Sequence, residues 1–136
     1  MQDTAIGLDV DRWYHAAMSI KHSEEMPRER VGAGKGTERQ VLIGSGEGPN
    51  FAMRRFIMQP GGGMPRHKNT VEHEQYVLRG RARIGIGEET HEVRAGDVVY
   101  IPALTPHWYE VLSTDEPFEF LCMIPNTPED RVEILE

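Results

Sequence analysis

The chain has 136 residues, with 15 Lys and Arg against 22 Asp and Glu, which gives a net charge of −7. This length suits one compact domain and is too short for two domains with separate hydrophobic cores. The acidic balance argues against a typical nucleic-acid-binding surface, and no apolar run in the sequence reaches the roughly 20 residues that a membrane helix needs.

The first residues carry early acids and lack the apolar segment of a secretory signal peptide. We therefore expect a cytoplasmic protein. Cys122 is the only cysteine in the sequence, so an intramolecular disulfide is impossible, and no CxxC pair indicates structural zinc or redox exchange.

Residues 1–39 are expected to form an N-terminal arm. Asp11 to Ile20 has the spacing of a short helix, because Trp13, Ala17 and Ile20 share one stripe. Gly, Pro and charged residues fill the segment from position 21 to position 39. We expect this arm to pack on the main domain or on a second subunit.

From position 40 onward, short runs rich in Val, Ile, Phe and Tyr are separated by Gly and Pro, which is the pattern of many brief strands. The expected strands are Gln40–Gly44, Phe51–Gln59, Glu72–Arg79, Ala82–Gly87, Thr90–Arg94, Val98–Ile101, His107–Leu112 and Phe118–Ile124. They predict an all-β barrel or jelly roll over residues 40–125, with a C-terminal tail over 126–136.

Three Gly-containing segments predict the turns of this barrel. Pro60 to Gly63 allows positive φ angles and is expected to end one strand. Gly87 to Glu89 and Ala95 to Asp97 are each expected to make a hairpin. The topology is therefore expected to be mostly antiparallel.

Histidines in two stretches indicate a metal site. The first stretch, PGGGMPRHKNTVEHEQYVLRGRARIGIG, holds His67, Asn69 and His73, and the second, AGDVVYIPALTPHWYEV, holds His107. Neutral imidazole is a common ligand for transition metals, and such a site needs several ligands projected from neighbouring strands. His15, His22 and His91 lie outside these stretches and are interpreted as ordinary surface residues.

These two stretches resemble the two conserved motifs of the cupin superfamily. The first motif runs G, five residues, HxH, then E, six residues and G, and the second runs G, five residues, P and a nearby histidine. The resemblance implies a double-stranded β-helix, a jelly-roll barrel, with an N-terminal arm. It is greatest to small single-domain bacterial cupins that bind manganese or iron through four histidines.

Carried over by position, the resemblance implies a site of His67, Asn69, His73 and His107 for a divalent transition metal, Mn(II) or Fe(II). Asn69 stands where the second histidine of HxH belongs, and His73 stands at the glutamate position. The Asn69 amide is either a fourth ligand, a hydrogen-bond partner of a bound water, or a residue that leaves one coordination position open. In the second motif, Leu104 replaces the usual glycine.

The alternation of side chains along strands predicts which residues line the substrate pocket. Glu72 and Glu74 flank His73 and are expected to point away from the interior. Arg54 and Arg55 must face opposite sides, so alternation places one of them in the barrel without deciding which. The resemblance to cupins implies Arg54, and we expect it to bind an anionic substrate, to polarise an oxygen or to pair with a buried Glu. The expected lining residues are Arg54, Met64, Gln75, Tyr109, Phe120 and Cys122.

The leading functional hypothesis is an Fe(II)- or Mn(II)-dependent dioxygenase or related oxidoreductase that acts on a small aromatic or enolic molecule. One alternative is a metal-dependent lyase or isomerase for small sugar acids, and another is a non-enzymatic domain that binds small molecules. We expect a homodimer, because a small open barrel leaves sheet edges and apolar faces to cover. Nucleic acid and membrane are not expected partners.

Overall fold

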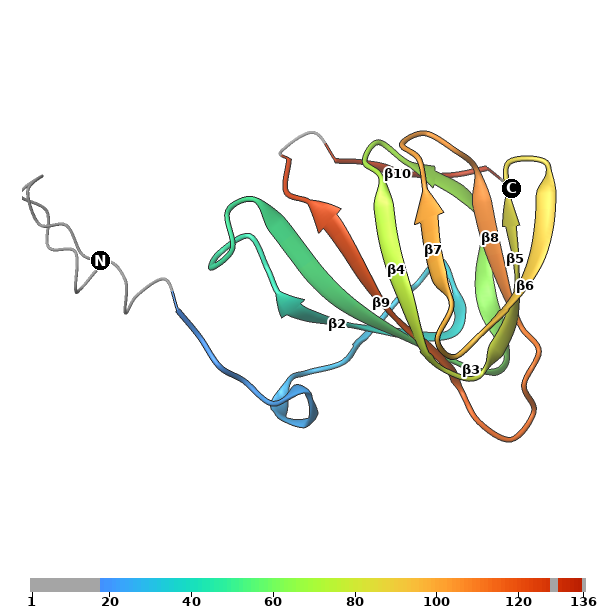
Figure 1. Ribbon diagram of the computed structural model, residues 1–136, viewed down its shortest axis with the longest axis horizontal. Coiled ribbons are helices and arrows are strands. Elements are labelled where there is room, and N and C mark those ends of the chain that lie inside the picture. Colours follow the sequence, from blue (N-terminus) through green and yellow to red (C-terminus); the bar gives the residue numbers. More distant parts are fainter. Residues whose placement is uncertain (1–17, 128–129, 136) are drawn as a thin grey trace, which may run out of the picture.

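The computed structural model describes residues 18–127 and 130–135. Within them, ten strands form one curled sheet with the shape of a half-open barrel (Figure 1). The strands are β1 (Glu29–Arg30), β2 (Lys35–Ile43), β3 (Phe51–Asn69), β4 (His73–Arg79), β5 (Arg81–Ile86), β6 (Glu89–Arg94), β7 (Val98–Ile101), β8 (His107–Val111), β9 (Phe118–Pro125) and β10 (Val132–Ile134). One 3-10 turn, η2 (Ser23–Glu25), precedes them. The expected all-β jelly-roll fold is confirmed.

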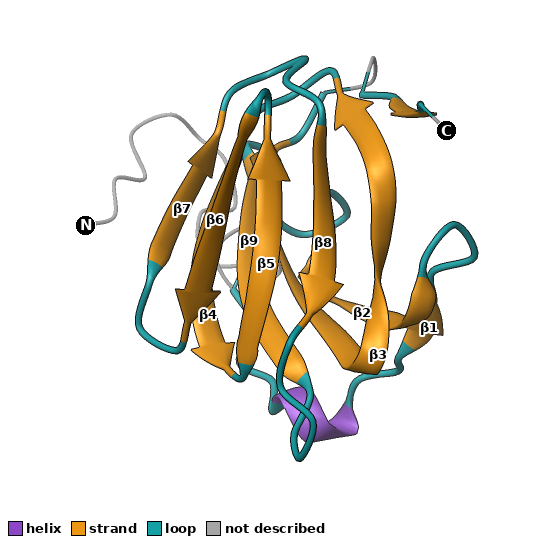
Figure 2. Ribbon diagram, turned by 90° about the vertical axis from the view of Figure 1, so that its right-hand side faces the viewer, coloured by secondary structure: helices purple, strands orange, loops and turns teal. Residues whose placement is uncertain are grey.

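The sheet runs in the order β6-β5-β8-β3-β9-β4-β7, and β1, β2 and β10 attach beside this path. Every strand pair is antiparallel. Figure 2 shows the layer of β5, β6 and β8 in front of β4 and β9. The two layers therefore face each other across the interior of the barrel.

The long strand β3 belongs to both layers. Its first half, from Phe51 to Met58, pairs with β9 along its whole length and with β2 over Met53 to Met58. Its second half pairs with β8 from Gly63 to His67 and with β10 from His67 to Asn69. Because β3 passes from one layer to the other, residues at its end lie opposite residues of β8.

The turn expected at Pro60 to Gly63 does not end β3, which continues to Asn69. The glycines instead allow neighbouring strands to approach closely. A Cβ at Gly62 would lie 2.4 Å from the carbonyl oxygen of Lys35, and one at Gly63 would lie 2.1 Å from that of Tyr109. This Gly-rich segment is therefore a bend within one strand.

The two expected hairpins differ in outcome. Gly87 begins the connection between β5 and β6, which pair along their whole length, so this hairpin is confirmed. The hairpin expected at Ala95 to Asp97 is wrong, because β7 pairs with β4 and not with β6. The Gly96 N–H donates to the carbonyl of Val77 on β4, and the Asp97 carbonyl accepts from the Val77 N–H. This turn therefore carries the chain from one layer to the other.

The sheet extends beyond its expected limits at both ends. Strand β2 begins at Lys35, and β1 pairs with it, so part of the expected arm lies within the sheet. The C-terminal tail supplies β10. The helix expected over Asp11 to Ile20 has its residues 11–17 outside the described residues, and positions 18–20 are not helical.

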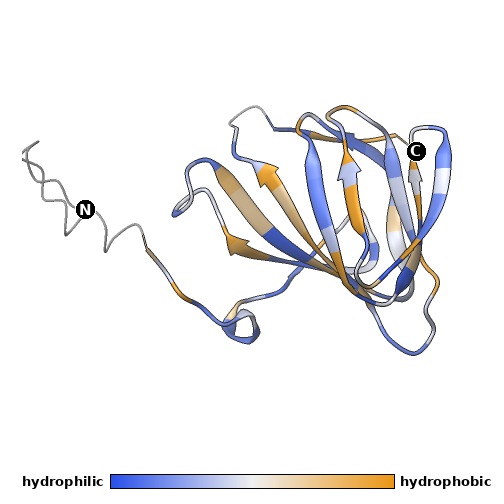
Figure 3. Ribbon diagram, in the orientation of Figure 1, coloured by the Kyte–Doolittle hydropathy of each residue, from blue (hydrophilic) through white to orange (hydrophobic). Residues whose placement is uncertain are grey.

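The core fills the space between the two layers. Its most buried members include Met58, Ile84, Ile101, Phe118 and Phe120, each at most 1% exposed. Strand β6 is the hydrophilic outer edge, whereas β7 consists of apolar residues (Figure 3). Among the described residues, no helix has both the length and the apolar character that crossing a membrane requires.

Candidate metal centre

Three strands bring the expected ligands together inside the barrel. His67 and Asn69 lie near and at the end of β3, His73 is the first residue of β4, and His107 is the first residue of β8. His67 pairs directly with His107 across the β3–β8 ladder. His67 and Asn69 share one face of β3 because strand side chains alternate, and Lys68 between them points away.

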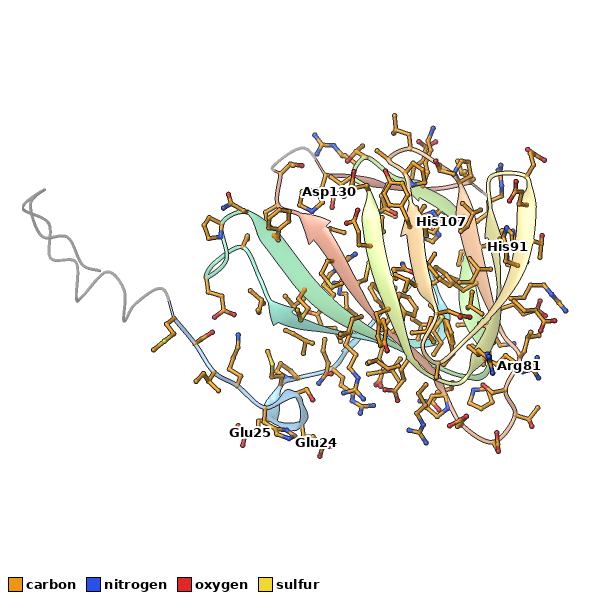
Figure 4. The ribbon with its side chains drawn as sticks, in the orientation of Figure 1. Glu24, Glu25, Arg81, His91, His107 and Asp130 are labelled. Carbon is orange, nitrogen blue, oxygen red and sulfur yellow. The ribbon has the colours of Figure 1, made fainter. Side chains whose placement is uncertain are left out.

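The three imidazole rings form one cluster. The ring centroids of His67 and His107 lie 4.2 Å apart, and those of His73 and His107 lie 5.5 Å apart. All three histidines and Asn69 are buried, and His107 is only 1% exposed. Figure 4 shows His107 within the upper part of the barrel, whereas His91 lies on the outer hairpin.

Backbone carbonyls fix two of the rings. His67 Nδ1 lies 2.7 Å from the carbonyl oxygen of Pro65, and His107 Nδ1 lies 2.9 Å from that of Thr105. A carbonyl oxygen only accepts, so each Nδ1 carries the proton and donates it. Each Nε2 therefore keeps its lone pair, which is the arrangement of a metal-ligating histidine.

The other two expected ligands have buried polar atoms without partners. Asn69 Oδ1 and His73 Nε2 make no hydrogen bond with any part of the chain that the structure describes. A buried polar atom without a partner costs on the order of 1–3 kcal/mol. These atoms therefore fit a group that enters the site from outside the chain, and a metal ion is such a group.

Burial keeps the imidazoles neutral. It lowers the pKa of His73 to about 3, with further lowering from the charge of Arg54 and from His107 and His67. Burial also lowers the pKa of His107 to about 4, against a smaller opposing effect of the Thr105 carbonyl. The pKa of His67 is lowered for the same reason. Near pH 7 all three rings therefore offer lone pairs.

The donor atoms are not gathered into a closed ligand set. Among residues 18–127 and 130–135, no three His, Cys, Asp or Glu side chains are already positioned to hold a metal ion. His73 Nδ1 contacts Cys122 Sγ at 3.1 Å and Arg54 Nη2 at 3.4 Å, and the fourth candidate donor is the Asn69 amide. The donor types fit a metal, and the rings would adjust as it binds.

A cavity of about 110 Å³ opens beside these donors. Phe118 and Val77, which alternation also directs to the interior, lie in the core and not in the cavity wall. The six expected lining residues do lie in that wall, namely Arg54, Met64, Gln75, Tyr109, Phe120 and Cys122. Gln75 Nε2 donates to Tyr109 Oη at 2.7 Å. The cavity therefore combines the four candidate ligands with a further polar pair.

One wall of the cavity is aromatic. The rings of Phe56 and Phe120 stack with centroids 5.2 Å apart, and those of Phe120 and Tyr109 do so at the same separation. Phe56 was not among the residues expected to line the pocket. It follows Arg54 by two residues on β3, so alternation places it on the same face as Arg54.

The two consecutive arginines of β3 have different environments. Arg55 pairs with the buried Glu119, with 2.6 Å between Nη2 and Oε1. Arg54 faces the cavity, as expected, and contacts Cys122 Sγ at 3.1 Å rather than a carboxylate. The ion pair with a buried Glu therefore belongs to Arg55, and no carboxylate of the described residues pairs with Arg54.

The remaining histidines and the flanking glutamates lie elsewhere. His91 pairs with Glu89 on the exposed hairpin, and His22 accepts the Glu24 N–H at the start of η2. His15 lies outside the described residues. Glu74 points away from the cavity, and its hydrogen bond with Glu72 raises its pKa to about 7.

Segments from both ends of the described chain complete the cavity wall, and the sequence did not predict them. Val31 and Ala33 lie just before β2, and Val132 lies on β10. Val132 pairs with Asn69, and Ile134 pairs with His67. No motif marks these residues, because their role depends on which strand their backbone joins.

The sequence profile of the cupin domain family matches residues 54–124, which begin three residues after the start of β3 and end one residue before the end of β9. Among solved structures, the polyketide cyclase RemF from Streptomyces resistomycificus is similar, with a TM-score of 0.75 and 30% identity, over 88% of this chain and 87% of that one. An oxalate decarboxylase from Lactobacillus farciminis, solved as a formate complex, has a TM-score of 0.69 and 26% identity, over 84% of this chain and 35% of that one.

Two curated proteins are also similar in sequence. The 1-methylthio-D-xylulose 5-phosphate methylsulfurylase of Rhodospirillum rubrum is 32% identical over 96 residues, which cover 71% of this chain and 60% of that protein. An uncharacterised protein from Methanocaldococcus jannaschii is 39% identical over 72 residues, which cover 52% of this chain and 57% of that protein. The chain thus spans less than two thirds of the length of these relatives.

Proposed function

The chain belongs to the cupin domain family, and we propose that it is an enzyme that uses a divalent manganese or iron ion to oxidise a small enolic or aromatic molecule. His67, His73 and His107 would supply nitrogen ligands, and Asn69 would supply an amide oxygen. This proposal rests on one observation above all. Two buried donor atoms of this set, Asn69 Oδ1 and His73 Nε2, lack any partner in the described chain.

The donor set favours manganese or iron with open coordination positions. Imidazole and amide oxygen suit such metals, whereas thiolate-rich sites select zinc, copper(I) or iron–sulfur clusters. A bound ion would activate the oxidant and orient the substrate. All four donors are neutral, so the ion would keep its full positive charge toward the cavity.

The chain's own residues prepare the cavity for such chemistry. The carbonyls of Pro65 and Thr105 hold the rings of His67 and His107 in one tautomer. The stacked rings of Phe56, Phe120 and Tyr109 give an apolar wall that excludes water. A dry site strengthens every electrostatic interaction within it.

A second candidate is a reaction without oxidation, in which the ion polarises a carbonyl or enol. This class includes a lyase or isomerase for small sugar acids. The likeness to the polyketide cyclase and to the methylsulfurylase supports it. A domain that only binds a small molecule is the third possibility, and neither likeness favours it.

The test begins with the metal. The protein is purified without an affinity tag or chelator, and its metal content is measured by mass spectrometry beside the variants His73→Ala, His107→Gln and His91→Gln. We expect near-stoichiometric manganese or iron in the wild type and in the exposed control His91→Gln, and loss of the ion from the other two variants. A wild type that neither contains nor takes up a metal would contradict the proposal.

The second step separates the two reaction classes. Oxygen consumption is measured for the metal-loaded protein with a panel of small enols, catechols and sugar acids. Oxygen consumption that is lost in the His107→Gln variant supports the proposed oxidation reaction. Chromatography measures the conversion of each panel compound. Conversion without oxygen uptake would transfer support to the lyase or isomerase class.

A further inference from the structure

The cavity has a charge opposite to that of the whole chain. The sequence has a net charge of −7, yet the described residues of the cavity wall include two arginines and no Asp or Glu. Arg39 is one of the two, and Glu29 neutralises it with 2.8 Å between Nη2 and Oε1. Arg54 is the other, and no carboxylate in the described chain pairs with it.

Arg54 is held in place without being neutralised. Its Nη2 contacts Cys122 Sγ at 3.1 Å and His73 Nδ1 at 3.4 Å, and its guanidinium carbon lies 5.1 Å from the centroid of the Phe56 ring. Its Nε is buried without a partner in the described residues. The Arg54 side chain is only partly buried, but its buried Nε has lost water without gaining a partner, and an anionic ligand in the cavity would compensate this loss.

Tyr109 adds a second donor to the same cavity. Its hydroxyl oxygen accepts a hydrogen bond from Gln75 Nε2, and an amide nitrogen only donates. The phenolic proton therefore remains available, and the described residues supply no acceptor for it. Cys122 Sγ joins the two groups, because it contacts Arg54 Nη2 at 3.1 Å and also Gln75 Nε2, the donor to Tyr109, at 3.6 Å.

We propose that the substrate of this site is a small organic carboxylate, bound through its carboxylate group by the Arg54 guanidinium and the Tyr109 hydroxyl. The proposal rests on the proposed function, since it names the substrate class of the same cavity. A guanidinium binds a carboxylate through parallel hydrogen bonds, and the stacked aromatic wall accommodates a flat apolar body. The carboxylate would also compensate the positive charge that a metal adds beside neutral ligands.

The test compares acids with their neutral amides. Acetate, crotonate and benzoate are titrated into the protein by calorimetry, beside acetamide, crotonamide and benzamide, both after chelation and after loading with Mn(II). We expect at least one acid to bind at least about tenfold more tightly than its amide, because a hydrogen bond between two charged groups is stronger than one to a neutral amide. This comparison needs no variant and so does not depend on a variant's folding.

Variants then assign the effect to the two residues. We expect Arg54→Gln to weaken binding of the acid about tenfold and to remove the preference over the amide, Arg54→Lys to keep part of it, and Tyr109→Phe to reduce affinity severalfold. Arg83→Gln is the matched control, because Arg83 pairs with Glu110 outside the cavity. Thermal unfolding of each variant checks that the fold is retained.

The outcomes distinguish this proposal from the proposed function. Acids that bind no better than their amides at millimolar concentrations, or an Arg54→Gln variant that keeps the preference, would overturn the anion site. Binding of acid that depends on Arg54 in a protein that takes up no Mn(II) would retain the anion site and overturn the metal proposal. Mn(II) binding without any preference for acids over amides would retain the metal proposal and overturn the anion site.

Discussion

Leu104 is the only non-glycine residue in the described chain with a positive φ, at 67°. It stands where the resemblance to cupins places a glycine, the residue that adopts a positive φ most easily. Its side chain is 57% exposed and contributes little to the core. The Leu104 N–H donates to the Asn69 carbonyl at 2.8 Å, which ties this strained position to a candidate ligand.

We predict that Leu104→Gly raises the free energy of unfolding by up to about 1 kcal/mol. Glycine removes a left-handed penalty of about 1–2 kcal/mol but increases the entropy of the unfolded chain. Urea denaturation measures the change. Leu104→Ala is the control and should show no gain, because alanine keeps the same penalty. A Gly variant less stable than the wild type would show that Leu104 makes a contact that outweighs the strain.

Acid should destabilise the metal-free protein through its buried histidines. In the folded state the pKa values of His73 and His107 are about 3 and about 4, whereas an unfolded histidine titrates near 6.5. Between these pKa values the unfolded state binds more protons than the folded state. The contribution of the two histidines to the free energy of unfolding is therefore fully present above about pH 6.5 and decreases as the pH falls. Each histidine contributes about 1.4 kcal/mol per pH unit.

Urea midpoints measured from pH 7 to pH 4 test this prediction. The variant His107→Gln should have a shallower decline than the wild type, and the variant His91→Gln should match the wild type. Equal declines in all three proteins would mean that carboxylates, and not the buried histidines, cause the loss.

Sequence reasoning at the residue scale located the four candidate ligands because their spacing matched a known motif. Alternation along single strands was enough to place Gln75 and Tyr109 in the cavity, whereas the choice of Arg54 over Arg55 also needed the resemblance to cupins. The contact between Cys122 and His73 could not be foreseen in the same way. It requires that β9 pairs with β4, and strand pairing is a long-range property that no local pattern encodes.

At the scale of elements, the bend in β3 determines where the ligands meet. The Gly-rich segment was interpreted as a turn because glycine and proline usually end strands. Here the strand continues, since β2 and β8 approach the glycines so closely that side chains do not fit. The bend aligns His67 with His107, which a true turn at Pro60 would separate.

We predict that Gly63→Ala lowers the free energy of unfolding by about 3 kcal/mol and weakens metal binding. The added Cβ would lie 2.1 Å from the Tyr109 carbonyl oxygen, so β3 and β8 must separate. Gly46→Ala is the control, because a Cβ there meets nothing within 4 Å. Denaturation and Mn(II) titration give the two readouts. A Gly63→Ala variant with the stability and the Mn(II) affinity of the wild type would mean that β3 and β8 can separate without cost and without moving the ligands.

At the scale of the whole molecule, a homodimer remains a prediction. Strand β7 is one edge of the sheet, and its Val98 and Tyr100 are 77% and 56% exposed. Exposed apolar edges are commonly covered in assemblies. Sedimentation equilibrium should give twice the chain mass for the wild type and a weaker association for Val98→Lys. A wild type that is monomeric at high micromolar concentration would contradict the prediction.

The C-terminal strand connects the whole fold to the site. Strand β10 pairs with the three residues of β3 that include His67 and Asn69, and the Leu135 N–H donates to the Arg66 carbonyl at 2.9 Å. Its Val132 also lines the cavity. The core between the two layers includes no residue of β10. The strand therefore supports the ligands more than it supports the fold.

A chain that ends at Thr127 should consequently fold but bind Mn(II) about tenfold more weakly, in the range found when groups that support metal ligands are removed. Losing β10 leaves the backbone of His67 and Asn69 unpaired on one side, so these side chains lose part of their fixed geometry. Val132→Ala separates the two contributions of β10, because it trims the cavity wall and keeps the backbone pairing. If the truncated chain and the wild type bind Mn(II) equally in calorimetry, β3, β4 and β8 position the ligands without β10. If the truncated chain fails to fold, as judged by circular dichroism, the strand supports the core after all.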